Sequence, residues 1–203
     1  MNSKKLYLLG VVGGLVLAGL IIMVTQLTQP TKKTQNSPPV LRADSDAFAS
    51  WVTVSPPNGL FSARFPAAPQ TTNNTLAIPD SSDVVVQDTF NASDDKGSIY
   101  FVSTAIYPVP FDPSKNSEAL QSALDGMVGA LPGAKLVNSQ AVDFKGVPSL
   151  EFMIQDASQA FHQGKLLIRD RTLYQVFVTY EEGALDENEY RNFLANFSAL
   201  GGN

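Results

Sequence analysis

FHQGKLLIRDRTLYQVFVTY, residues 161–180, is the stretch of sequence that decides the fold. It contains two strand-like runs, Phe161 to Arg169 and Leu173 to Tyr180, with only three residues between them. A connection this short predicts an antiparallel hairpin. In the second run apolar residues occupy both odd and even positions, so both of its faces must be covered. The segment therefore predicts the centre of an antiparallel sheet with a packed layer on each side.

Five more runs have the period-two alternation of half-buried strands and are bounded by turn residues. The dipeptide Lys145-Gly146 is short enough to join two of them as a second hairpin. The additional predicted strands are Phe61 to Phe65, Val84 to Phe90, Ser98 to Tyr107, Lys135 to Phe144 and Val147 to Gln155.

Two amphipathic helices are predicted to lie on this sheet. The first starts at Ser117 and is stopped by Pro132-Gly133, with apolar residues at helical spacing between them. The second follows Asp186, which forms an Asx version of the capping box with Glu189, and its apolar stripe runs from Tyr190 to Phe197. The predicted fold class is α+β, a central, largely antiparallel β-sheet sandwiched by helices and preceded by one N-terminal transmembrane helix.

The predicted transmembrane helix is the uncharged apolar run from Leu6 to Val24, which follows Lys4 and Lys5. At about 1.5 Å per residue it reaches roughly the 30 Å thickness of a bilayer's hydrocarbon core. A cleaved signal peptide is the alternative, but its apolar core ends at small residues, whereas this run continues past Ala18 and Gly19. We therefore predict an uncleaved, single-pass anchor in the cytoplasmic membrane, with the N-terminus inside and the domain outside, periplasmic or extracellular.

Gly10 and Gly14 stand four residues apart within this run, a spacing that would let two anchors approach closely and form a weak homodimer. Glycine is also common in single-span anchors that do not dimerise. A smooth, lipid-facing helix is the simpler interpretation of this pattern.

Composition divides the chain into residues 1–25 (anchor), 26–50 (a flexible tether rich in Pro, Thr and Gln) and 51–203 (one domain). Residues 1–50 carry five Lys and Arg against two Asp, whereas residues 51–203 carry nine against seventeen acidic residues. The domain therefore has a net charge near −8. This charge argues against nucleic acid and against anionic lipid head groups as partners. The chain has no cysteine, so disulfides and thiol chemistry are excluded.

Several segments of the domain resemble the PsbP-like superfamily. They are Gly59 to Pro66, Val142 to Phe152, Arg169 to Val176 and Phe193 to Phe197, together with the long central helix. The resemblance implies an α/β/α sandwich and an accessory or assembly role in which the domain binds other proteins. Its motifs are packing and turn features, so it implies no catalytic residue for this chain.

Candidate site residues are few. Glu151, Arg169 and Arg171 lie on or beside neighbouring predicted strands and are expected to form surface ion pairs of small energetic worth. His162 is the one histidine of the chain and is expected to be a surface or strand residue without a metal site. No cofactor or metal ion is expected.

The acidic loops that contain Asp80 with Asp83 and Asp94 with Asp95 look superficially suited to calcium. A predicted strand separates them, so they are expected at opposite ends of that strand and unable to share an ion.

Two kinds of function remain open. The first, which the sequence favours, is a non-enzymatic, membrane-tethered module of the cell envelope that binds other envelope or membrane proteins or assists their assembly. The alternative is a hydrolase or a small-ligand sensor with a cleft between sheet and helix. For a hydrolase, no nucleophile, base and orienting group can be assembled from the sequence, whereas a sensor would require an apolar cavity.

Overall fold

The computed structural model describes residues 48–201. Its framework is a seven-stranded sheet in the order β3-β4-β5-β9-β8-β7-β6, and every neighbouring pair is antiparallel. The α+β class and the central antiparallel sheet are thus confirmed. The strands are β3 (Gln70–Ala77), β4 (Val84–Ser93), β5 (Ile99–Ile106), β6 (Lys135–Phe144), β7 (Val147–Gln155), β8 (Phe161–Arg169) and β9 (Thr172–Tyr180).

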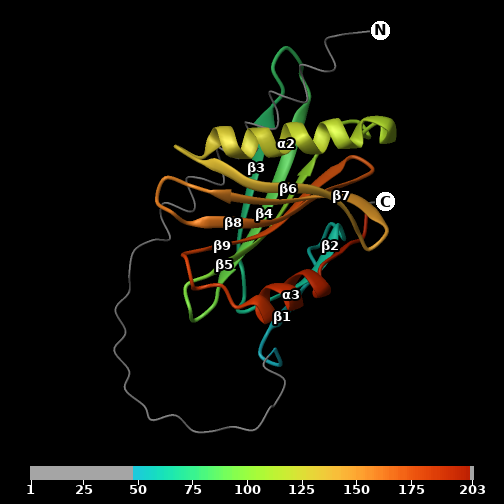
Figure 1. Ribbon diagram of the computed structural model, residues 1–203. Helices are drawn as coiled ribbons and strands as arrows, with labels where there is room; N and C mark the ends of the chain where they lie inside the picture. The colour runs from blue at the N-terminus through green and yellow to red at the C-terminus, as the bar shows by residue number, and fades with distance from the viewer. Residues whose placement is uncertain (1–47, 202–203) are drawn as a thin grey trace, which may run out of the picture.

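One layer lies on each face of this sheet (Figure 1). On one face lies α2 (Asn116–Ala130), which follows a short 3₁₀ turn, η1 (Pro113–Lys115). On the other face lies α3 (Glu187–Asn196) beside a small second sheet. That sheet has the order β1-β2-β10 and consists of β1 (Val52–Val54), β2 (Phe61–Phe65) and β10 (Ser198–Ala199).

Strand β9 contributes to both hydrophobic cores, as predicted from its apolar residues at odd and even positions. Leu173 and Phe177 belong to the core under α2, where Phe177 stacks on Phe101 with ring centroids 4.7 Å apart. Tyr174 and Val176 belong to the core under α3. The central strands are therefore buried on both faces, and the small domain has two apolar layers that stabilise it.

The start of α3 is fixed by the predicted Asp186 cap, and the Glu189 side chain of the predicted capping box contacts the neighbouring strand and turn. Asp186 Oδ1 accepts hydrogen bonds from the backbone N–H groups of Asn188 (2.9 Å) and Glu189 (3.3 Å). The Glu189 carboxylate accepts hydrogen bonds from Lys96 Nζ (3.1 Å) and Tyr100 OH (3.4 Å). Glu189 thus connects α3 to Lys96 in the β4–β5 turn and to Tyr100 in β5.

Three short or polar strands were not predicted. β3 is rich in Thr and Asn and lacks the apolar face by which the other strands were recognised. It is an edge strand, and its backbone pairing with β4 holds it in place. β1 and β10 flank β2, which the sequence did not distinguish from the strands of the main sheet. Alternation alone cannot tell which sheet a strand joins, since both sheets bury alternate residues.

The packed chain extends further toward the N-terminus than the predicted boundary at residue 51. The Phe48 ring lies 5.6 Å from that of Trp51, and the Phe48 carbonyl accepts a hydrogen bond from Arg64. The predicted anchor, Leu6 to Val24, with Gly10 and Gly14, lies outside the described residues. Within residues 48–201, no helix has the length and apolar character needed to span a bilayer.

Candidate functional site

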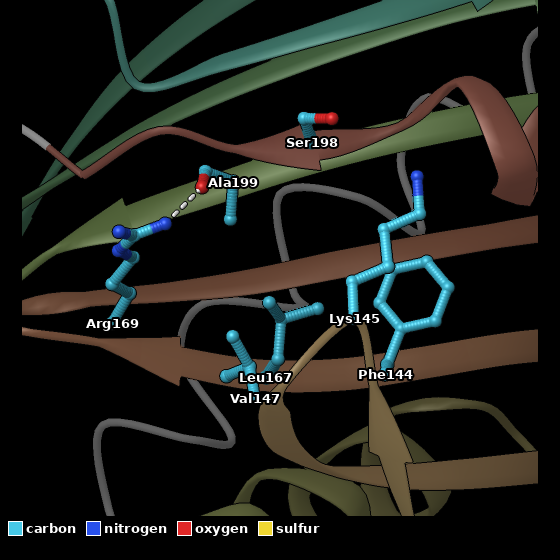
Figure 2. A pocket seen from close by; sticks show the side chains of 7 residues that line it. All are labelled: Phe144, Lys145, Val147, Leu167, Arg169, Ser198 and Ala199. Carbon is cyan, nitrogen blue, oxygen red and sulfur yellow. Dashed lines mark hydrogen bonds between the residues drawn. The ribbon is translucent and has the colours of Figure 1, made fainter.

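A hollow of about 160 Å³ opens between the β6–β7 turn, the end of β8 and the segment after α3. Figure 2 shows Arg169 and Lys145 at its two ends, with Val147 and Leu167 between them. The lining residues are Phe144, Lys145, Val147, Leu167, Arg169, Ser198 and Ala199. The hollow therefore has an apolar floor and a cation at each end.

The predicted Lys145-Gly146 hairpin turn places the first cation. Lys145 has φ 57° and Gly146 has φ 80°, which is the pattern of a type I′ turn. Asp143 Oδ1 accepts a hydrogen bond from the Gly146 N–H (2.7 Å) and fixes the turn. From this turn Lys145 Nζ donates to the carbonyl groups of Ala195 and Phe197 at the end of α3, both at 2.7 Å. The lysine thus caps the helix C-terminus, where a positive charge is favourable.

The second cation, Arg169, lies at the end of β8. Its Nη1 donates to the Ala199 carbonyl at 2.5 Å, as the dashed line in Figure 2 marks. Both cations therefore hydrogen-bond to backbone carbonyl oxygens, which do not neutralise their charge. Partial removal of water lowers the pKa of the Lys145 amine, consistent with the absence of a carboxylate among the residues that line the hollow.

Phe144 separates the hollow from a second lysine. Lys145 Nζ and Lys165 Nζ each lie 5.6 Å from the Phe144 ring centroid, a cation–π distance. Lys165 is only 9% exposed and forms an ion pair with Glu151, whose side chain is 42% exposed. The charge of Lys165 is thus compensated, whereas Lys145 and Arg169 form no ion pair within residues 48–201.

The prediction that Glu151 pairs with Arg169 or Arg171 is wrong. The register of β7 and β8 places Lys165 directly opposite Glu151. Arg169 is four residues further along β8, about 13 Å away at 3.3 Å per residue. Arg171 lies exposed beyond the end of that strand, where its backbone carbonyl accepts a hydrogen bond from the Tyr107 N–H.

His162 lies on a strand, β8, but is not a surface residue, because it is only 3% exposed. Its Nδ1 lies 2.9 Å from Thr179 Oγ1, and its Nε2 lies 3.1 Å from Asp156 Oδ2. Carboxylate, imidazole and hydroxyl follow one another as in a hydrolytic triad. Thr179 is only 7% exposed, however, so a substrate cannot reach its hydroxyl. We interpret the three residues as a structural link between the β7–β8 turn and β9.

We expect this link to make stability depend on pH. Burial lowers the pKa of His162 below its usual value near 6.5, against the opposing effect of Asp156. The unfolded chain therefore binds a proton before the folded chain does, so the free energy of unfolding should fall as the pH drops from about 7 to 5. Urea unfolding across this range tests the expectation. Because the chain has one histidine, His162→Gln should remove this component of the slope, and an unchanged slope would contradict it.

The acidic loops lie at opposite ends of β4, as predicted. Asp80 and Asp83 precede the strand, whereas Asp94 and Asp95 follow it. Asp94 Oδ1 accepts hydrogen bonds from the backbone N–H groups of Lys96 and Ser98 and so shapes the β4–β5 turn. Among the residues that the structure describes, no three potential ligands converge on a metal position.

Of the residues that line the hollow, sequence reasoning had singled out only Arg169. The Lys145-Gly146 turn was recognised, but its contact with α3 spans fifty residues of chain. The position of Lys145 in a tight turn was the one feature of the sequence that pointed to this part of the site. That feature does not specify which helix end the lysine contacts.

The chain is similar to a cyanobacterial PsbP. The match is with the solution structure of CyanoP from Synechocystis sp. PCC 6803, at a TM-score of 0.43 and 15% sequence identity. It covers 80% of this chain and 99% of CyanoP. This is the family that the sequence motifs resemble. No family model matches the sequence, and no curated protein matches it.

Proposed function

We propose that this chain is a non-enzymatic module of the cell envelope that binds other envelope or membrane proteins, or assists their assembly, through the hollow beside α3. Leu6 to Val24 would hold it in the cytoplasmic membrane, with the domain outside. The observation that carries the proposal is a concave, apolar-floored site whose two cations lack carboxylate partners among its lining residues. Such a site suits an anchor residue of a protein partner.

The size of the hollow favours a protein partner over a small ligand. Pockets for drug-sized molecules commonly measure about 300 to 1,000 Å³. At about 160 Å³ the hollow has room for one inserted side chain. The hydrolase alternative has a single supporting observation, the hydrogen-bonded series Asp156, His162 and Thr179. The Thr179 hydroxyl, which would be the nucleophile, belongs to a buried residue.

Photocrosslinking in intact cells tests the proposal. A photoreactive amino acid at Val147, on the floor of the hollow, should give adducts with envelope or membrane proteins. The matched control is the same amino acid at Gln121, an exposed position on α2, the helix on the opposite face of the sheet. The proposal fails if the two positions give the same adducts, if neither gives any, or if the adducts are cytoplasmic proteins.

A further inference from the structure

We propose that the hollow receives an apolar side chain that is flanked by a carboxylate, from an acidic segment of the partner protein. This inference rests on the proposed function and adds the chemistry of the partner. It commits to an acidic, apolar protein segment as the occupant.

Unused hydrogen-bond donors support this choice. A lysine amine has three N–H donors and a guanidinium has five. Among the residues that the structure describes, two of the Lys145 donors are used for the carbonyl groups of Ala195 and Phe197, and one Arg169 donor is used for Ala199. The remaining donors can bind a carboxylate, which an arginine can hold in a bidentate manner.

The distribution of charge also favours an acidic guest. Both charged residues that line the hollow are cations, although the domain as a whole has a net charge near −8. The nearby carboxylates, Asp143 near the end of β6 and Asp170 in the β8–β9 turn, do not line the hollow. Asp143 is also held by the Gly146 N–H. A carboxylate that enters the hollow would therefore meet positive charge at each end.

The floor selects against a purely ionic guest. Val147 and Leu167 present apolar surface between the two cations, and the Phe144 ring adds apolar surface beside Lys145. An inserted apolar side chain would remove this surface from water, a gain that a phosphate or a hydrated head group cannot supply. An anionic membrane would in addition be repelled by the acidic remainder of the domain.

Fluorescence anisotropy of labelled peptides with the full-length chain in neutral detergent tests the inference. The probes are the capped peptide Glu-Leu-Glu-Phe-Glu and matched versions in which Gln or Lys replaces each Glu. We expect the Glu peptide to bind at least about tenfold more tightly than the Gln peptide, because hydrogen bonds to charged groups are the stronger ones. The affinity of the Glu peptide should fall as salt is added, and the Lys peptide should bind most weakly of the three.

Four variants locate the binding. Arg169→Gln should weaken the Glu peptide about tenfold. Val147→Phe, which fills the floor without changing charge, should weaken both the Glu and the Gln peptides. Lys115→Gln and Lys135→Gln remove cations that do not line the hollow and should leave binding unchanged, apart from a small nonspecific salt effect. Circular dichroism melts of each variant separate loss of binding from loss of folding.

The inference is overturned if the Glu peptide binds no better than the Gln peptide, or if Lys135→Gln weakens it as much as Arg169→Gln. It is also overturned if none of the peptides binds and the chain instead binds anionic phosphatidylserine vesicles in a way that depends on Arg169. If a photoreactive residue at Val147 still labels a specific envelope protein in any of these cases, the proposed function stands and only the partner's chemistry changes.

Discussion

Replacing either Phe193 or Phe197 by alanine is expected to lower the free energy of unfolding by about 3 to 5 kcal/mol. Both side chains are fully buried between α3 and the sheet. The Phe193 ring packs against Tyr100 and Phe65, with centroid distances of 5.2 and 5.7 Å. Because these neighbours belong to different strands, they cannot all move to refill the space that the ring leaves. A loss of this size would threaten a domain of ordinary stability.

Phe197 should be as sensitive for a related reason. Its ring lies 6.1 Å from those of Phe61 and Tyr174 and 6.4 Å from that of Phe144 at the hollow. Urea or thermal unfolding of both variants measures the effect. The control is Arg191→Ala on the same helix, an exposed position where a change within about 0.5 kcal/mol is expected. Losses below about 1 kcal/mol for both phenylalanines would show that α3 is not docked as described.

The second large effect is expected at Gly164, where β8 passes β9 without space for a side chain. A Cβ at this position would collide with the backbone carbonyl oxygen of Val176 and with Phe177. Backbone atoms cannot rotate away as a flexible side chain can, so Gly164→Ala must push the two central strands apart. We expect a loss of about 3 kcal/mol, the upper end of the usual range for overpacking.

Gly129→Ala is the matched control for this prediction. Gly129 lies within α2, and nothing approaches the position of its Cβ within 4 Å. Alanine is the better helix former, so this variant should be unchanged or up to about 1 kcal/mol more stable. The same unfolding measurement serves both variants. If Gly164→Ala unfolds within 0.5 kcal/mol of the unsubstituted chain, the close approach of β8 and β9 is incorrect.

Most of the main sheet could be predicted from the sequence because the apolar composition of its central strands shows that they are buried. The strand Thr172–Tyr180 lacks a polar face, and such a strand can be stable only between two layers. Both helices were also predictable, since their apolar stripes and the Asp186 cap are local patterns. The edge strand Gln70–Ala77 escaped prediction because backbone pairing, and not its side chains, holds it in place.

The candidate site was much less predictable than the fold. Glu151 was correctly recognised as an ion-pair former, but its partner depends on the register of two strands, which composition does not specify. His162 was expected from its polar neighbours to be a surface or strand residue. Because the strand places it opposite Thr179, it is buried and hydrogen-bonded.

The sequence by itself thus determined the fold class, the acidic character of the domain and the prediction of a membrane anchor, since each depends on local pattern or on summed composition. Only the tertiary structure decided the hollow. Its lining comes from Phe144 to Val147, from the end of β8 and from the segment after α3, which meet through packing across the sheet. The contact of Lys145 with Ala195 and Phe197 joins positions about fifty residues apart. Contacts at such separations depend on how whole elements pack, and no local period in the sequence encodes them.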